Sequence, residues 1–425
     1  MKHFALFVAI AGVLLSIVKA EKAASNSFEQ SVTLSQFLAM VAASNLDYAA
    51  QRYNVSIAQA QLVAAKVSPN PTIQYVYGRD VSGEQQPTTY NGGLTQTIET
   101  AGKRGFRTTV AQKNLLAASA TLEDFFRTLR GAAANAYIDA IAGQLIVGEK
   151  RRAYESLDRL AAANAKRLEV GEVGEVDVNQ ARVDALQAEG DLIAAESTEK
   201  SNTLALVQLL GKPNVAPPIP VGGLEMPARA FNLSHLLADA LQKRPDIAAA
   251  RRTLESMQAS IRLTRANRIP DVTFGITAQN NTASTNPINP SPDFNSMTFS
   301  LSVPVPLFNS YRGEYLAATQ TALQAERTLR SIELKAEVDI RQNYSRYEFS
   351  TKRLAQYQGA ALDLAEKVLE ARLISYQKGA APLLDVLTAQ KANTDVHLAA
   401  IEAQTEHAKA LVALEQAAGI WDLDF

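Results

Sequence analysis

The residue types that perform catalysis or bind metals are sparse in this sequence and lie far apart. The 425 residues include no Cys and four His, of which His3 belongs to an apolar N-terminal segment. The other three, His235, His397 and His407, lack the i,i+4 spacing with which one helix face binds a metal ion. Phosphate-binding glycine loops and nucleophile elbows are absent as well. We therefore expect no enzyme, no cofactor and no metal site.

Two aspartates instead recur in a repeated turn motif. Asp177 and Asp385 each stand six residues after a glycine, Gly171 and Gly379, and each precedes a valine. The motif is repeated with a shift of 208 residues, from 177 to 385. Other pairs keep the same order and shift: Arg104 with Arg312, Gly105 with Gly313, and Gly211 with Gly419. Such a fixed shift predicts a duplicated chain.

Each half is predicted to contain an opening helix, a strand pair, a long helix, a turn and a return helix. Thr33 and Asn232 are suitable N-caps for opening helices over 33–67 and 232–267. The long segments contain no Pro and repeat apolar residues every seven positions, which is typical of coiled coils. The long and return helices are expected at 106–170, 176–210, 313–378 and 383–418.

The domain organisation follows from the duplication and from the composition of the ends. An apolar run that stops before Ala20 predicts a cleaved signal peptide, and the absence of Cys excludes a lipid-modified N-terminal cysteine. The predicted parts are a signal peptide (1–20), a first structural repeat (21–211), a proline-rich linker (212–231), a second repeat (232–419) and a C-terminal tail (420–425).

The strand pairs, 71–98 and 271–306, alternate apolar and polar residues, so that one face of each is apolar. Two structures have this pattern: a water-soluble sheet covered on one side by helices, and a membrane barrel with a wet lumen. Four strands cannot close a barrel, whereas three chains would supply twelve. The second interpretation predicts a lipid-facing row of Phe274, Ile276, Phe299, Leu301 and Val303.

The formal net charge of −1 gives no general affinity for nucleic acid. No apolar segment after residue 20 approaches the length of a membrane-spanning helix. A chain of this kind would enter a membrane only through strands.

The duplicated plan, the segment from Gln96 to Arg104 and the paired Gly-x₅-Asp-Val turns resemble the TolC-like outer-membrane efflux family over residues 31–419. The resemblance implies a mainly α chain with a membrane β-barrel: a homotrimer with a 12-stranded barrel in outer-membrane lipid and a long periplasmic α-helical barrel. It also implies a periplasmic adaptor and an inner-membrane pump as partners. The Glu99–Gly105 segment is most similar to the cation-efflux branch of the resistance–nodulation–division systems.

The family's site residues are carried over onto the two turns. Asp385 is the residue expected to narrow the periplasmic aperture, with Asp177 as its repeat partner and Tyr376 as a candidate for holding the closed state. The adaptor is expected to dock at Gly171, Glu172, Gly379 and Ala380. Two structural roles stay open: the glycines as helix C-caps and the aspartates as N-caps or solvated turn residues.

The expected function is a passive exit duct for cargo delivered by pump and adaptor, with divalent metal cations as candidate cargo. One alternative is the same duct in a drug-efflux or type I protein-secretion system. An alternative of another class is a periplasmic coiled-coil scaffold, which explains the helices but not the strands.

Overall fold

A computed structural model describes residues 31–79, 87–212, 216–226, 229–284, 290 and 292–421. The predicted signal peptide (1–20) and residues 422–425 of the predicted tail lie outside this range. Within it, no helix is long and apolar enough to cross a membrane.

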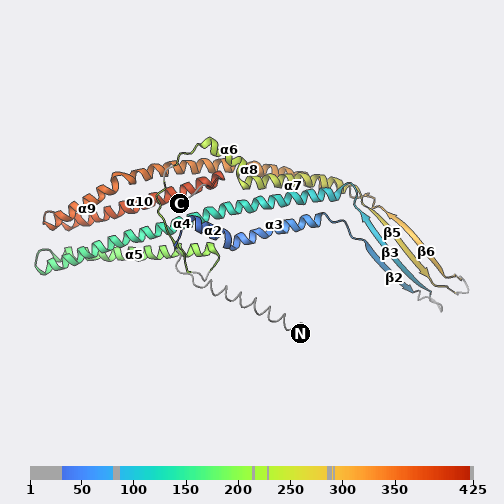
Figure 1. Cartoon of the computed structure of the whole chain (residues 1–425), viewed down its shortest axis with the longest axis horizontal. Coiled ribbons are helices and arrows are strands. Elements are labelled where there is room, and N and C mark those ends of the chain that lie inside the picture. Colours follow the sequence, from blue (N-terminus) through green and yellow to red (C-terminus); the bar gives the residue numbers. More distant parts are fainter. Residues whose placement is uncertain are drawn as a thin grey trace, which may run out of the picture. The chain divides into compact units, whose positions relative to one another are not determined.

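Helices dominate both halves, and each half contains one β-hairpin (Figure 1). The first half comprises β1 (Ser31–Val32), α2 (Leu34–Ser44), α3 (Leu46–Ala65), β2 (Thr72–Arg79), β3 (Thr88–Ile98), α4 (Lys103–Glu169) and α5 (Glu175–Leu210). The linker holds β4 (Ile219–Pro220). The second half comprises α6 (Leu233–Lys243), α7 (Pro245–Asn267), β5 (Val272–Asn281), β6 (Phe294–Ser302), α8 (Arg312–Gln356), α9 (Leu362–Gln377) and α10 (Leu383–Ala418).

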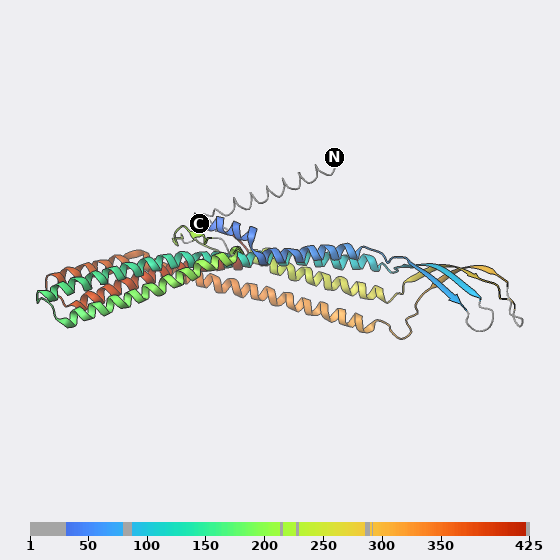
Figure 2. The ribbon, with the colours of Figure 1, turned by 90° about the horizontal axis from the view of Figure 1, so that it is seen from below.

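The chain divides into two compact units, and each contains segments of both halves. One unit holds the sheet and the adjoining helices within 51–124 and 245–335. The other holds the described residues of 31–50, 125–244 and 336–421. In this second unit α4 pairs with α5, and α9 with α10 (Figure 2).

The opening helices were predicted to be continuous, and this is wrong. Their N-caps are as predicted. Thr33 forms a capping box with Gln36, and the side chain of Asn232 accepts hydrogen bonds from two backbone N–H groups. Each helix is interrupted after 11 residues, where Asn45 (ψ 125°) and Arg244 (ψ 124°) leave the helical conformation. Each half therefore begins with two helices, α2–α3 and α6–α7.

The two interruptions perform the same task with different side chains. Asn45 Nδ2 donates to the carbonyl of Leu209 (2.9 Å), and Arg244 Nη1 donates to the carbonyl of Ala417 (2.9 Å). Positions 209 and 417 are related by the 208-residue repeat. The last carbonyls of a helix have no partner within the helix, so each side chain satisfies one at the end of a return helix.

The second long segment was predicted to be continuous over 313–378, and it is also interrupted. A π-helical segment at Tyr357–Ala361 separates α8 from α9, and Gly359 within it has φ −100° and ψ −134°. The equivalent position in the first half is Arg151, and there α4 runs unbroken for 67 residues.

The larger core lies in the unit that contains α2, and the linker is tied to it by two tyrosines. The Tyr137 hydroxyl lies 2.7 Å from the carbonyl oxygens of Val32 and Val221. The Tyr347 hydroxyl accepts a hydrogen bond from the backbone N–H of Arg229 (2.7 Å), in the part of the linker that follows β4. The linker is therefore fixed to α4 at one end and to α8 at the other.

His407 is fully buried in this unit, and we expect it to make stability depend on pH. Its Nδ1 lies 3.4 Å from the Ser350 hydroxyl and 3.3 Å from that of Thr351, while Nε2 is buried without a partner. Desolvation by burial lowers the pKa of His407, so the folded protein favours the neutral ring. Its contribution to stability is complete above the unfolded pKa of about 6.5 and is lost as pH falls below it.

Thermal unfolding of wild type and His407→Leu at pH 7.5 and 5.5 measures this effect. Between pH 7.5 and 5.5 the melting temperature of wild type should decrease more than that of His407→Leu, because the variant has no ring to protonate. Equal losses in the two proteins would show that folding does not shift the pKa of His407.

Candidate functional sites

The sheet exposes a wide apolar face. Its order is β2-β3-β5-β6, all antiparallel, and Phe274 lies opposite Leu301 while Ile276 lies opposite Phe299. Residues directly opposite each other point to the same face of a sheet. Phe299 is 76% exposed and Leu301 is 64% exposed, so no element in the described part of the chain covers them. Val303, predicted to continue this row, lies one residue beyond β6, which ends at Ser302.

The opposite face of the sheet is polar but uncharged. Side chains on this face are joined by hydrogen bonds, such as Thr97 to Thr273 (2.9 Å) and Thr89 to Asn281 (2.8 Å). The one charged residue within the four strands β2, β3, β5 and β6 is Arg79. It lies on the other, apolar face, because every second residue of a strand points to the same side and Arg79 is in the row of Tyr77 and Ile73. The outer strands β2 and β6 each have a second edge with no strand beside it among the described residues. Such an edge offers unpaired backbone groups to another strand.

The segment that carries the family resemblance forms the junction between sheet and helices. Ala101 and Gly102 both have positive φ (54° and 70°), which turns the chain from β3 into α4. Lys103 Nζ then lies 2.7 Å from Asp271 Oδ1, directly before β5. Burial opposes the ionised carboxylate, but hydrogen bonds from Lys103 and Thr100 outweigh it, and the pKa of Asp271 is lowered.

Arg107 is the second tie at this junction. Its guanidinium pairs with Glu99. It also donates to the carbonyl of Ala65 (3.1 Å), the last residue of α3, and to that of Val67 (2.9 Å), two residues further on. The hydrogen bond that Arg107 donates to Glu99 is the main cause of the raised pKa of Arg107. The charged residues of this segment thus hold helix and strand ends together.

The two predicted aspartates occupy the same position in the first turn of their helices. The helix α5 is capped by Gly174 and α10 by Pro382, so neither Asp177 nor Asp385 is an N-cap. An acidic residue in the first turn still stabilises a helix through the dipole. Asp177 is exposed, whereas Asp385 Oδ2 lies 3.0 Å from Nη1 of Arg372 on α9. The spacing of residues along the chain did not indicate this ion pair.

The two predicted docking glycines end their helices as the left-handed residue of the C-terminal turn. Gly171 and Gly379 have φ 78° and 71°. In each turn the following N–H, of Glu172 or Ala380, donates at 2.9 Å to a carbonyl five residues earlier, as in a Schellman motif. A Cβ on either glycine would have no atom within 4 Å beyond its immediate neighbours in the chain. The surface beside both turns is therefore open, and a docking role there remains a prediction.

Tyr376 is buried inside the chain rather than exposed at the tip. It is 8% exposed, its hydroxyl donates to Asn164 on α4, and the guanidinium of Arg167 lies 5.0 Å from its ring centre. It packs in a small core with Ala181 and Leu383, which brings α4, α5, α9 and α10 together. A role in the closed aperture remains a prediction, and the observed contacts fix the four helices of one chain.

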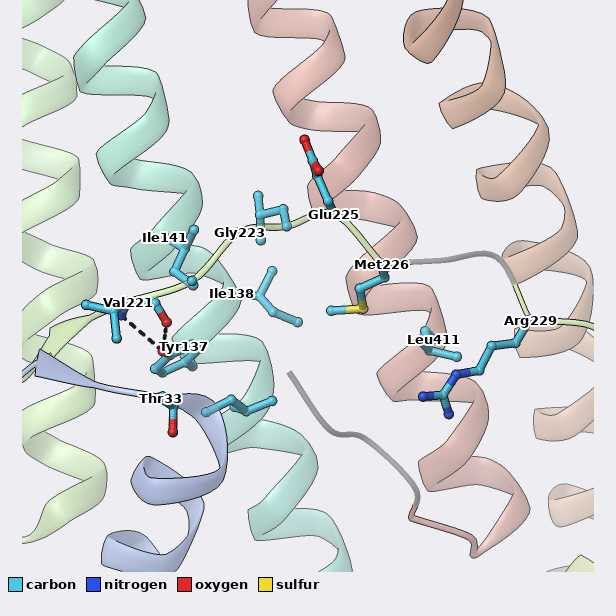
Figure 3. Close-up of a pocket in the computed structure, with 13 residues that line it drawn as sticks. Thr33, Tyr137, Ile138, Ile141, Val221, Gly223, Glu225, Met226, Arg229 and Leu411 are labelled. Carbon is cyan, nitrogen blue, oxygen red and sulfur yellow. Dashed lines mark hydrogen bonds between the residues drawn. The ribbon is translucent and has the colours of Figure 1, made fainter.

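A cavity of about 550 Å³ lies under the linker (Figure 3). Residues 221–226 form one wall, and Ile138 of α4 and Leu411 of α10 form the floor. The charged Arg229 at this cavity pairs with Glu415 at 3.6 Å. The lining is mainly apolar, and its polar groups do not converge on one point. The described residues also contain no cluster of three or more His, Cys, Asp or Glu that could hold a metal ion.

Comparisons with known proteins agree with this architecture. The sequence model of the outer membrane efflux protein family matches residues 38–212 and 236–420. The cobalt-zinc-cadmium resistance protein CzcC of Cupriavidus metallidurans is 25% identical over 85% of this chain and 83% of its own length. The pyoverdine export outer membrane protein OpmQ of Pseudomonas putida is 25% identical over 92% of this chain and 87% of its own.

Solved structures show the same fold. CusC superposes with a TM-score of 0.76 at 16% identity, covering 91% of this chain and 92% of CusC. The outer membrane channel MtrE of Neisseria gonorrhoeae gives a TM-score of 0.75 at 19% identity, covering 91% of this chain and 89% of MtrE. The resemblance inferred from the duplicated turns is confirmed, and the chain belongs to the outer membrane efflux protein family.

Proposed function

We propose that this chain is the outer-membrane exit duct of a tripartite efflux system. The family match over both halves carries this proposal. In it, a homotrimer receives cargo from an inner-membrane pump of the resistance–nodulation–division type through a periplasmic adaptor. The exposed apolar row and the two open sheet edges support a 12-stranded barrel made by three chains.

Divalent metal cations are the cargo that we propose. The similarity to a cobalt-zinc-cadmium resistance protein favours them, whereas the similarity to a pyoverdine export protein favours a larger organic cargo. A strain without the gene should become sensitive to Co²⁺, Zn²⁺ and Cd²⁺, and the wild-type gene should restore growth. Unchanged metal tolerance with increased drug sensitivity would instead assign the duct to a drug pump.

The scaffold alternative is tested by the physical state of the protein. A duct should be recovered from the outer-membrane fraction as a trimer whose migration in electrophoresis changes on heating. A coiled-coil scaffold should appear in the soluble periplasmic fraction.

We place Asp385 at the aperture of the duct, and its ion pair then predicts the ion selectivity. Arg372 places a positive charge 3.0 Å from each Asp385 carboxylate. In planar bilayers Arg372→Gln should therefore make the purified trimer more cation-selective, and Asp385→Asn should make it less so. Both effects should be larger in 0.1 M than in 1 M salt, where the screening length is about 3 Å.

Asp47→Asn is the matched control, because Asp47 is exposed in the first turn of α3 and outside the tip. It should leave selectivity unchanged. If Asp385→Asn behaves like this control, Asp385 does not line the aperture and only stabilises the start of α10.

A further inference from the structure

A buried carboxylate faces an imidazole between α4 and α10. Glu149 is only 4% exposed, and its Oε2 is buried without a hydrogen-bond partner. His397 on α10 places its Nδ1 4.0 Å from this oxygen. A buried carboxylate oxygen without hydrogen bonds is costly, so it indicates a ligand that donates to it or binds it.

The positively charged group beside Glu149 is the guanidinium of Arg152, and this contact is weak. Arg152 Nη2 lies 2.9 Å from Oε2, but the Arg152 side chain is 70% exposed and the contact lacks hydrogen-bond geometry. An exposed arginine can turn into water with little loss of stability. The neighbouring cations are engaged elsewhere, Lys150 with Asp191 (2.8 Å) and Arg151 with Glu196 (2.6 Å).

The two donor atoms have a separation that one ion can bridge. Nitrogen and oxygen ligands lie about 2.0–2.2 Å from a zinc-sized cation, so two of them are about 3.4 Å apart at a tetrahedral angle and at most about 4.2 Å apart. The observed 4.0 Å corresponds to an angle of about 144° at such a cation, so the two side chains would have to approach by about 0.6 Å for tetrahedral coordination. Asn393, one turn before His397, has a buried Oδ1 that also lacks a partner.

The donor types select the class of cation. Imidazole nitrogen together with carboxylate oxygen suits divalent transition metals better than Mg²⁺ or Ca²⁺, which prefer oxygen alone. We propose that Glu149 and His397 bind a divalent transition-metal cation, that water completes its coordination, and that Arg152 is the side chain displaced on binding. The site lies within one chain and does not depend on the cargo of the duct.

Co²⁺ is a suitable probe because its visible absorption reports nitrogen and oxygen coordination. The full chain, purified without a polyhistidine tag, should bind one Co²⁺ per chain in titration calorimetry and equilibrium dialysis. Glu149→Gln and His397→Leu should each weaken binding at least tenfold and remove the visible band. Co²⁺ should also raise the melting temperature of wild type but not of Glu149→Gln, because binding to the folded state stabilises it.

Arg152→Gln separates this proposal from a purely structural ion pair. If the cation displaces Arg152, its removal should tighten Co²⁺ binding several-fold. His235→Leu, at an exposed histidine on α6, is the control and should bind Co²⁺ as wild type does. The proposal is overturned if wild type does not bind Co²⁺ stoichiometrically, if Glu149→Gln binds it normally, or if Arg152→Gln does not bind it more tightly.

Discussion

Phe299→Arg should eliminate the outer-membrane trimer. Phe299 is 76% exposed on the apolar face of the sheet, opposite Ile276, and in the proposed barrel it contacts lipid. An arginine at the midplane of a bilayer costs about 2–4 kcal/mol, and the trimer would contain it three times. The measurement is the amount of heat-modifiable trimer in the outer-membrane fraction, compared with total protein.

Ser300→Arg is the matched control. Ser300 is the next residue of β6, it lies opposite Gly275, and its side chain points to the other face. An arginine there would reach water in the lumen, so the trimer should form in nearly normal amounts. If both variants lose the trimer equally, the two faces of the sheet have been assigned incorrectly.

Gly379→Trp should abolish export while leaving the trimer intact. The surface beside Gly379 is open, so an indole ring there would occupy the space that an adaptor helix needs. Export is measured as metal tolerance of the complemented strain, and docking as cross-linking between duct and adaptor. Both should be lost together.

Strain in the turn must be separated from obstruction. Gly379 has φ 71°, and a side chain in this left-handed conformation costs about 1–2 kcal/mol. Gly379→Ala carries the same backbone strain without the bulk, so it should export nearly normally. Normal export by a variant with Trp at both Gly171 and Gly379 would exclude these turns as the docking surface.

The helices with strong local signals could be predicted closely. The return helices were expected at 176–210 and 383–418 and are found at Glu175–Leu210 and Leu383–Ala418. Glycines and prolines at their ends fix these limits, because glycine readily adopts the left-handed C-cap and proline cannot extend a helix.

One of the missed interruptions did have a signal. Arg244 precedes Pro245, and a residue before proline disfavours the helical conformation, while proline favours the first position of a new helix. The opening helices of the two halves align with a shift of 199 residues, which relates Arg244 to Asn45, and Asn45 has no proline after it. The interruption of the first opening helix could therefore have been inferred only from the second half.

The side-chain contacts could not be predicted, because they join helices that are distant in the sequence. Arg372 reaches Asp385 across a turn, and Glu149 approaches His397 from a helix of the other half. A single sequence gives the spacing of residues on one helix but not the register between two helices. The burial of Tyr376 depends on that register as well, since four helices enclose it.

The unequal helix interruptions bear on how the duplicated gene could change further. Arg244 also lies 3.8 Å from Asp339, and the residue equivalent to Asp339 in the first half is Gly131, so this charge pair exists once. Recombination between the two copies that replaced the second half by the first would lose both partners. A replacement in the other direction would carry the guanidinium to the place of Asn45 and the carboxylate to position 131 together, so it would add a second charge pair. The two copies therefore complete the same interruption with different chemistry, a neutral amide in the first half and an ion pair in the second.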